Sequence, residues 1–256
     1  MPQETIILIL YCCIADTLTD QDNKHTQGHL YLSEIVLCGV LYALKGTSFR
    51  RFYWWLKQQH LFASLPERSR LQRILIDKQA YCKRFLADQT LFTVLDSFGV
   101  EVIHPMRENR SKQSQKVSKK GLSNHRWIIG RKIAVTLNQN MQVVCASDDT
   151  ANVHDSKFNL AHHLLDSITL ADQCFKQQNN TPTNFKICKK GTWNDRMLIE
   201  TLFSLWTRIC HMKKSFHRSV KGFQAKIAYL FSLTNIAFSN NPSLGFNTLS
   251  LVQWPI

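Results

Sequence analysis

Three carboxylates stand in three different local settings along this chain, and together they could hold divalent metal ions. Asp96 follows the apolar run 91–95, and Asp172 follows the similar run 168–171. Glu200 lies within residues 193–200, where the apolar side chains recur at helical spacing. Two acids at strand ends and one acid on a helix can converge on one site. Mg²⁺ prefers hard oxygen ligands and keeps several waters, so a few carboxylates are enough to bind it.

A shared metal site would suit phosphodiester chemistry. Two Mg²⁺ ions about 3.5–4 Å apart can activate an attacking oxygen and stabilise a leaving one. The ions also offset the mutual repulsion of clustered carboxylates. Each acid has a simpler explanation as well. Asp96 and Asp172 could cap turns or helices, and Glu200 could pair with Arg196 on a helix surface.

The position of Glu200 around its helix favours the metal site over the surface pair. At 100° per residue, the apolar side chains between residues 198 and 210 form one broad face. Arg196, Glu200 and Thr207 lie just beyond the edge of that face. A helix packed on a sheet meets the strand ends at such a rim, and ligands of open α/β sheets bind beyond strand ends. We therefore expect Glu200 to reach the site of Asp96 and Asp172.

The chain is strongly basic, since 32 Lys and Arg residues against 18 Asp and Glu give it a net charge of +14. This balance favours a polyanionic partner, because neutralising phosphates releases counterions. Residues 107–132 concentrate the positive charge, with polar and glycine residues in the gaps. We predict that the first part of this segment is a flexible basic loop between two strands that holds DNA near Asp96. The alternative is a solvated basic surface.

Cysteine usage and the N-terminal sequence bear on the compartment. The eight cysteines include no Cys-x-x-Cys pair, which argues against a zinc module and against a disulfide framework. A reducing cytoplasm fits this usage best. The apolar stretch 6–15 is too short to span a bilayer and lacks the preceding positive charges of a signal peptide. We predict that it is a buried helix and that the chain has no membrane partner.

Hydrophobic periodicity divides the chain into three parts. Residues 1–88 read as a small helical bundle for DNA binding or self-association. Residues 89–239 read as a mixed α/β domain, with expected strands at 91–95, 126–137, 142–146, 168–171 and 185–188 and expected helices at 158–165, 194–212 and 220–238. The strands 126–137 and 142–146 should form a hairpin. Residues 240–256 show no clear period, so we expect an extended arm or a disordered tail.

Four segments together resemble the DDE transposases of bacterial insertion sequences, in the subset with a Tyr-x2-Arg-x3-Glu signature. They are residues 96–102, 120–132, 170–175 and 189–204, and the resemblance covers about residues 30–238. It implies a ribonuclease-H-like mixed sheet flanked by helices, preceded by a small helical domain. It also implies that the first Asp lies on the first strand, the second Asp after the fourth strand and the Glu on a later helix. These positions correspond to Asp96, Asp172 and Glu200.

The resemblance implies an activity, cofactors and partners. The enzyme would bind the terminal inverted repeats of an element, cleave DNA strands there and join the freed ends to target DNA. Two Mg²⁺ ions, with Mn²⁺ as a substitute, would be held by the three acids, and two element ends would be joined by a homodimer on DNA. The location would be the bacterial cytoplasm, at the nucleoid. The expected DNA-binding residues are Arg196, Lys112, Lys116, Lys119, Lys120, Arg126, Arg131, Lys132, Lys189, Lys190, Trp193 and Arg208.

The chain departs from the family pattern at several positions. Trp193 replaces the signature Tyr, so a hydroxyl contact to DNA is lost while stacking stays possible. The family pattern has a basic residue at position 207. This chain has Thr207 there, and its basic residue, Arg208, comes one position later. Relatives commonly carry Pro at position 99 and Gly at position 174, where this chain has Gly99 and Cys174.

These departures motivate a second hypothesis, a catalytically decayed DNA-binding relative of such a transposase. A structural RNA-binding protein has little support, because no stacking-platform motif is visible. His154 and Asp155 resemble a His-Asp pair often found between the two family aspartates. We expect this pair to cap the following helix rather than to do chemistry.

Overall fold

The computed structural model describes residues 1–24, 28–108, 117–123, 126–158, 160, 164, 166–176, 183–188, 196–254 and 256, without the side chains of Arg107 and Arg196. The chain forms two compact units. Unit 1 comprises residues 1–85, 209–211 and 221–256, and unit 2 comprises residues 86–208 and 212–220. The expected boundary near residue 88 is therefore present, while the segment after residue 220 belongs with the N-terminal helices.

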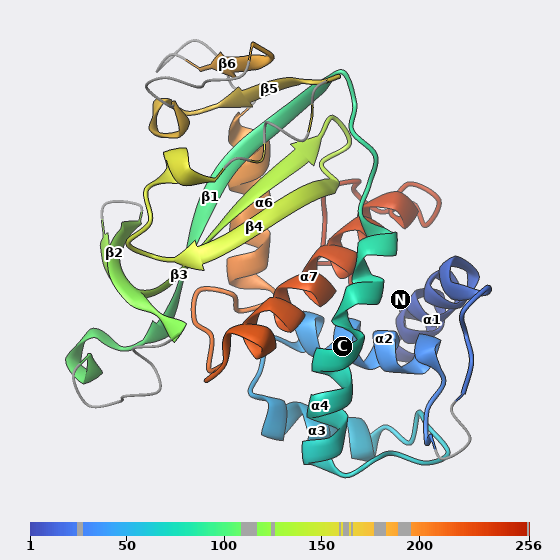
Figure 1. Ribbon diagram of the computed structural model, residues 1–256. Coiled ribbons are helices and arrows are strands. Elements are labelled where there is room, and N and C mark those ends of the chain that lie inside the picture. Colours follow the sequence, from blue (N-terminus) through green and yellow to red (C-terminus); the bar gives the residue numbers. More distant parts are fainter. Residues whose placement is uncertain are drawn as a thin grey trace. The chain divides into compact units, whose positions relative to one another are not determined.

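Unit 2 is built on an open sheet of mixed strand direction (Figure 1). Its strands are β1 (Phe92–Ile103), β2 (Lys119–Ser123), β3 (Arg126–Asn138), β4 (Val143–Thr150), β5 (Ile168–Ala171) and β6 (Phe185–Ile187). The order is β2-β3-β1-β5-β6, and β4 also pairs with β3. The strands β2 and β4 lie one after the other along the same edge of β3, because β2 pairs with residues 126–130 and β4 with residues 131–137.

Two parallel strands, β1 and β5, meet at the centre of this sheet in a fixed register. Leu95 pairs with Ala171, and Thr93 pairs with Thr169. The hydroxyl oxygens of Thr93 and Thr169 are 3.0 Å apart, and Ser167 donates a hydrogen bond of 3.1 Å to Thr93. These hydroxyls are buried, so sliding the strands by one residue would leave them without hydrogen bonds and would turn the apolar side chains away from the core.

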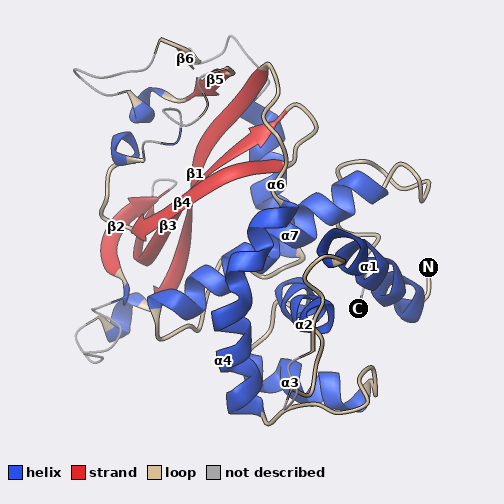
Figure 2. Cartoon of the chain, turned by 45° about the vertical axis from the view of Figure 1, so that its right-hand side comes forward, coloured by secondary structure: helices blue, strands red, loops and turns tan. Residues whose placement is uncertain are grey.

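Each face of the sheet has its own apolar cover. On one face, Leu95, Ala134 and Ala171 pack with the buried side chains of Phe158, Leu160 and Phe175. The opposite face carries Phe98, whose ring centroid lies 5.1 Å from that of Phe203 on helix α6 (Arg196–Arg208). Figure 2 shows α6 against the strands. The apolar face predicted for α6 is confirmed, because Ile199, Leu202, Phe203 and Trp206 are buried.

Most of unit 1 consists of helices. They are α1 (Gln3–Leu18), α2 (Leu32–Lys45), α3 (Phe49–Gln58), α4 (Arg68–Lys78) and α7 (Val220–Asn240), with the 3₁₀ helix η1 (Gln79–Phe85). The apolar stretch 6–15 lies within α1 and contributes the buried Ile6, Leu10 and Ile14, as predicted. The Tyr229 hydroxyl on α7 donates 2.9 Å to the carbonyl of Leu75, and its ring lies against Gly39 of α2. These contacts explain why α7 belongs to unit 1.

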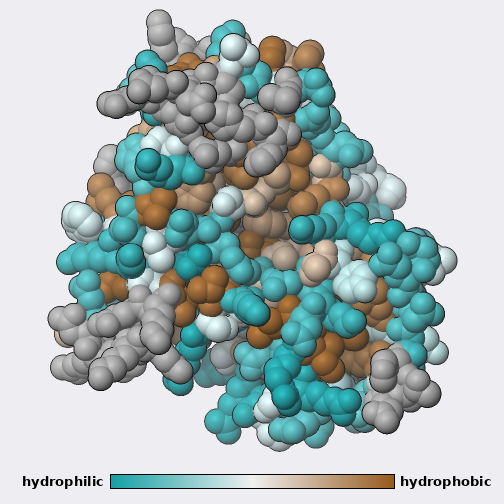
Figure 3. Space-filling view, viewed as in Figure 1, coloured by the Kyte–Doolittle hydropathy of each residue, from teal (hydrophilic) through white to brown (hydrophobic). Residues whose placement is uncertain are grey.

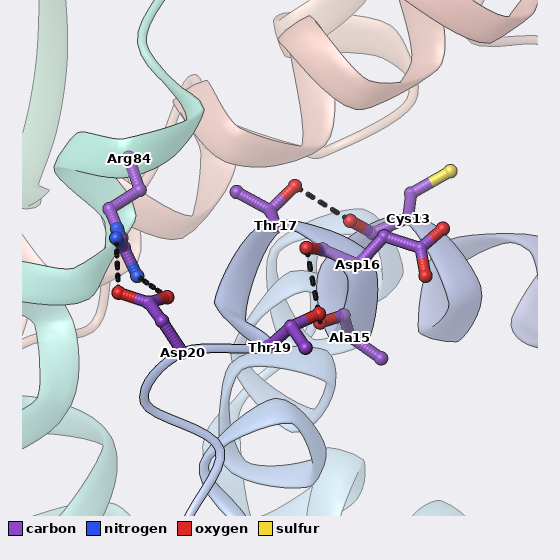
Figure 4. Close-up of polar contacts among 7 residues, drawn as sticks. All are labelled: Cys13, Ala15, Asp16, Thr17, Thr19, Asp20 and Arg84. Atoms are coloured by element: carbon purple, nitrogen blue, oxygen red, sulfur yellow. Dashed lines mark hydrogen bonds and ion pairs between the residues drawn. The ribbon is translucent and has the colours of Figure 1, made fainter.

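The end of α1 is held by local and long-range polar contacts (Figure 4). The Thr17 hydroxyl donates 2.8 Å to the Cys13 carbonyl, and the Thr19 hydroxyl donates 3.0 Å to the Asp16 carbonyl. Beyond the helix, Arg84 donates two hydrogen bonds to the Asp20 carboxylate, from Nη1 to Oδ1 at 2.5 Å and from Nη2 to Oδ2 at 2.8 Å. Exposed basic residues lie along α4 and η1. At the lower edge of the view, Figure 3 shows hydrophilic residues gathered over α3 and the start of α4.

Residues 240–254 are folded, contrary to the expectation of an arm or disordered tail. The Asn241 amide donates to the carbonyls of Asn247, Thr248 and Ser250 at 2.9–3.1 Å. Trp254 is fully buried, and its indole N–H donates 2.7 Å to Asn241. The sequence hides this fold because one asparagine side chain organises it, rather than a repeating apolar pattern.

Two further predictions for unit 2 need correction. The apolar run 91–95 is only the start of β1, which continues to Ile103, so Asp96 lies within a strand and not at its end. Residues 119–123 form β2, although the first part of the basic segment was expected to be a loop between two strands. The expected helix at 158–165 lies largely outside the described residues. The other predicted strands and helices of this unit are present, including the β3–β4 hairpin.

In the described part of the chain, no single helix combines the length and apolarity needed to cross a membrane. The helices α2 and α3 pass such a test only as a pair, with a bend of 117° between them.

Candidate active site where β5 leaves β1

Asp96 and Asp172 occupy equivalent places on neighbouring parallel strands. Each directly follows one member of the Leu95–Ala171 register pair. Leu95 and Ala171 belong to the same apolar cluster, so the next residue on each strand points to the opposite face. Asp172 keeps an extended backbone (φ −76°, ψ 161°), which carries the strand direction one residue further. Because paired strands lie about 4.8 Å apart, the backbones of the two aspartates follow neighbouring positions of the sheet.

Each aspartate also accepts a hydrogen bond from the backbone N–H of the residue that follows it. Asp96 Oδ1 accepts from the backbone N–H of Ser97 at 2.7 Å, and Asp172 Oδ1 accepts from that of Gln173 at 2.6 Å. Asp172 caps the 3₁₀ helix η5 (Gln173–Phe175), so the predicted capping role is present beside the proposed catalytic one. Both side chains are half-buried. One oxygen of each carboxylate is therefore oriented by its own backbone.

The helix α6 brings Glu200 to the same face of the sheet. Phe98 shares a face with Asp96, and Phe98 packs on Phe203 of α6. After α6, the Lys213 carbonyl accepts 3.1 Å from the N–H of Glu101, three residues beyond Phe98. The helix and β1 therefore run in the same direction, and the N-terminal turn of α6 lies towards Asp96. Glu200 precedes Phe203 by about 4.5 Å along the helix, and Asp96 precedes Phe98 by about 6.6 Å along the strand.

Glu200 is exposed, whereas its neighbour Ile199 is fully buried. This matches the predicted position at the rim of the apolar face. Within the described residues, no three His, Cys, Asp or Glu side chains are gathered closely enough to hold a metal ion. The donor chemistry of the three acids still suits Mg²⁺, because two carboxylates that follow adjacent strands and a third on the covering helix are hard oxygen donors.

The electrostatic surroundings of Cys174 show which charges gather at this place. Burial raises the pKa of the Cys174 thiol most, and the nearby carboxylates of Asp172, Asp155 and Asp96 raise it further, while Lys132 opposes them. Because three carboxylates raise the pKa of this thiol, the electrostatic field there is locally negative, although the net charge of the whole chain is positive. Such a field attracts a divalent cation.

Lys132 and Asp155 form an ion pair beside this field. Their side chains are only 7% and 17% exposed, and Lys132 Nζ lies 3.1 Å from Asp155 Oδ1 and 3.1 Å from the Val153 carbonyl. His154 caps the 3₁₀ helix η3 (Asp155–Lys157) by accepting from the N–H of Ser156 at 3.3 Å. The expected capping role of His154 is therefore confirmed, whereas Asp155 is engaged with Lys132.

Two residues expected to bind DNA are instead part of the interior of unit 2. Arg131 is 5% exposed, reaches Asp148 at 2.6 Å and donates 2.8 Å to the Val117 carbonyl. Lys132 is 6% exposed and engaged as described above. We correct both assignments, because a buried and neutralised cation is not presented to a phosphate. The sequence concealed this because alternate residues of a central strand point to opposite covered faces.

The remaining expected DNA contacts divide into two groups. Lys119, Lys120, Arg126 and Arg208 are exposed, and Lys120 lies 3.8 Å from Glu108. Lys112, Lys116, Lys189, Lys190 and Trp193 lie outside the described residues, as does the side chain of Arg196. The exposed residues on β2 and β3 place positive charge at one edge of the sheet.

The two departures from the family pattern have different structural settings. A Cβ on Gly99 would lie 2.3 Å from the Ser123 hydroxyl and 2.7 Å from Ile128 Cδ1, so a side chain at this position would displace those two side chains. Cys174 is exposed within η5, two residues after the Asp172 cap. The absence of a side chain at residue 99 therefore leaves room for Ser123 of β2 and Ile128 of β3.

A buried acid, Glu101, was missed by sequence reasoning. Its side chain is 6% exposed and pairs with Arg126 at 2.9 Å and with Lys214 at 3.4 Å. Alternation along β1 could not have located it, because Val100 and Glu101 are adjacent and both buried, and the pairing with β3 shifts register between Glu101 and Ile103.

The chain matches no protein-family model, and neither a curated protein nor a solved structure is significantly similar to it.

Proposed function

We propose that this protein is a DDE transposase, which cleaves DNA strands at the ends of a mobile element and joins them to target DNA. The observation that carries the proposal is the placement of Asp96 and Asp172 after the Leu95–Ala171 pair, on the face that α6 covers. Glu200 is the third acid, on that helix.

The strand order supports a ribonuclease-H-like architecture. Apart from the short β2, the sheet runs β4-β3-β1-β5-β6, with β1, β3 and β4 antiparallel and with β5 and β6 parallel to β1. In that architecture the first Asp lies on β1 and the second follows the strand paired parallel to it. Asp96 and Asp172 have these places.

Asp96, Asp172 and Glu200 would hold the Mg²⁺ ions, and when bound these ions would supply charge stabilisation at the scissile phosphate. The chain's own contribution is orientation. The backbone N–H groups of Ser97 and Gln173 orient one oxygen of each aspartate. Lys119, Lys120, Arg126 and Arg208 would hold the DNA backbone by charge.

The partners follow from the reaction. The substrates would be the terminal inverted repeats and a target DNA, and joining two ends calls for two copies of the chain on DNA. The exposed arginines of α4 and its neighbours in unit 1 would contribute to DNA binding or to self-association. Such a protein would act at the nucleoid of a bacterial cell.

Substitution of the acids tests the proposal. Asp96→Asn, Asp172→Asn and Glu200→Gln should each reduce Mg²⁺-dependent nicking of DNA that carries the gene and its flanks by at least about a hundredfold, because each removes a charged ligand. DNA binding, measured by fluorescence anisotropy, should persist. Asp88→Asn is the matched control, since Asp88 is an exposed aspartate of the same unit. Nicking at the wild-type rate by Asp96→Asn rejects the assignment.

A second candidate is a DNA-binding relative that has lost catalysis. It is favoured by one finding: among the described residues, no three His, Cys, Asp or Glu side chains lie closely enough together to hold a metal ion. This candidate predicts wild-type DNA affinity without nicking in Mg²⁺ or Mn²⁺. Nicking above background by the wild-type protein, abolished in Asp96→Asn, excludes it.

A further inference from the structure

A cleft of about 450 Å³ opens in unit 2 next to the far end of β1. Glu101, the residue at its β1 side, lies five residues beyond Asp96, about 16 Å along the strand. The cleft is lined by Glu101, His104, Pro105, Arg126, Trp127, Lys213 and Lys214. Its volume falls within the range of about 300–1,000 Å³ that is usual for small-ligand sites.

The cleft contains one buried carboxylate that is paired with two cations. Glu101 is buried, and its two oxygens face two different cations, Arg126 Nη2 at 2.9 Å and Lys214 Nζ at 3.4 Å. The loop that supplies Lys214 is fixed to β1, because the N–H of Ser215 donates 2.8 Å to the Glu101 carbonyl. A carboxylate has about four acceptor positions, so Glu101 keeps capacity for a further donor. With Lys213 exposed nearby, the cleft combines an acceptor and surplus positive charge.

The aromatic wall of the cleft is Trp127. Its side chain is 61% exposed, although it lies within a strand and pairs with Leu122. Lys120 Nζ lies 5.7 Å from the centroid of the Trp127 ring. An exposed indole beside cations offers a stacking surface of the kind that binds unpaired bases.

We propose that this cleft binds an unpaired nucleotide of a DNA strand, and that it prefers a base with an exocyclic amine. The base would stack on Trp127 and donate its amine to Glu101, and the neighbouring phosphates would lie against Lys213 and Lys214. A site for a phosphate alone would have no use for the indole, and the acid would repel it. The inference rests on the proposed function in taking DNA as the ligand.

Short fluorescent oligonucleotides test the site on the full chain. Wild-type protein should bind oligo(dC) more tightly than oligo(dT), since the amine of cytosine suits a Glu acceptor. It should bind an abasic strand of equal length about tenfold more weakly than oligo(dC), because stacking contributes about 1–3 kcal/mol per base. Lys213→Ala should reduce the slope of log affinity against log salt by about 0.7.

Two tryptophan variants supply the comparison. Trp127→Ala should lose about tenfold in oligo(dC) affinity, and Trp127→Phe should lose less. Both variants should bind intact duplex DNA with the affinity of the wild-type protein. Trp54→Ala is the matched control, because Trp54 is 55% exposed, has Lys57 at 5.7 Å from its ring and does not line this cleft. Glu101→Gln should erase the preference for oligo(dC) over oligo(dT).

Three results would overturn the site: wild-type oligo(dC) affinity in Trp127→Ala, equal binding of the abasic strand, or equal loss of duplex binding. Equal wild-type affinity for oligo(dC) and oligo(dT) would overturn the role of Glu101. The nicking assay on Asp96→Asn is independent of these measurements. If Asp96→Asn nicks DNA normally, the transposase assignment fails while a Trp127-dependent oligonucleotide site stands.

Discussion

Asp96 and Asp172 point to the same face of one sheet from adjacent parallel strands. Asp96 follows Leu95, Asp172 follows Ala171, and Leu95 and Ala171 are paired across the two strands. Their equivalence depends on the register that Thr93, Thr169 and Ser167 fix with buried hydroxyl contacts of 3.0 and 3.1 Å. A slip of one residue would place one carboxylate on the opposite face. The strand register therefore fixes the positions of these two acids relative to each other.

The field around Cys174 provides a test of metal binding that does not depend on activity. Mg²⁺ bound by Asp96 and Asp172 should lower the pKa of the Cys174 thiol, because added positive charge cancels the carboxylates that raise it. Alkylation of Cys174 near pH 8 should therefore speed up with Mg²⁺ at constant ionic strength, as followed by mass spectrometry. The exposed Cys12 of unit 1 is the internal control. An equal response in Asp172→Asn would contradict the metal site.

Arg131 and Lys119 should respond in opposite ways to removal of charge. Arg131→Met should lower the free energy of unfolding by about 3–5 kcal/mol, because it removes the buried cation that neutralises Asp148, whose side chain is only 13% exposed. Lys119→Met, at an exposed position of β2, should change stability by less than about 0.5 kcal/mol and weaken DNA binding instead. Urea denaturation and anisotropy titrations measure the two effects. Similar stability losses in both variants would mean that Arg131 is not structural.

Lys226 should make stability depend on pH. Burial lowers its pKa to about 8, from 10.5 for the free side chain. Between those values the unfolded chain binds more protons than the folded chain, so this residue makes stability rise with pH from about 8 and imposes its full penalty below that. Lys226→Met should therefore stabilise the protein most at pH 7, by a few kcal/mol, and progressively less above pH 8.

The comparison must be made between variants at each pH. Burial raises the pKa of Cys82 and Cys210 to about 12, so above pH 9 ionisation of these thiols in the unfolded chain opposes the lysine effect. The difference between wild type and Lys226→Met isolates the lysine. Lys221→Met, exposed on the same helix, should show no such difference. A Lys226→Met effect that is constant from pH 7 to 10 would disprove the assignment.

Gly46 should be intolerant of any side chain, for two separable reasons. It ends α2 with φ +59°, and a Cβ there would lie 2.5 Å from the Cys210 carbonyl oxygen. Gly245 shares the strained backbone, φ +68°, but a Cβ there would meet nothing within 4 Å. Gly245→Ala should thus cost about 1–2 kcal/mol from backbone strain, and Gly46→Ala should cost distinctly more. Thermal unfolding of both proteins gives the comparison, and equal costs would show that the backbone relaxes around Gly46.

The sequence by itself determined the parts whose signal is local. The apolar runs located β5 and β6, the polar turn located the β3–β4 hairpin, and the helical wheel of α6 placed Glu200 at the rim of its buried face. These features follow from side-chain period, because a half-buried element repeats its apolar residues at the period of its own geometry. Asp172 was likewise placed directly after its strand.

Tertiary structure decided what depends on which neighbour covers a residue. A basic pattern cannot separate Lys119, which is exposed on an edge strand, from Arg131 and Lys132, which a central strand buries against acids. Nor could it reveal that Asn241 folds the last described segment around Trp254, or that Glu101 meets Arg126 and Lys214. The physical reason is the same in each case: the cost of burying a polar group is offset by partners distant in the sequence, and only the folded chain brings them together.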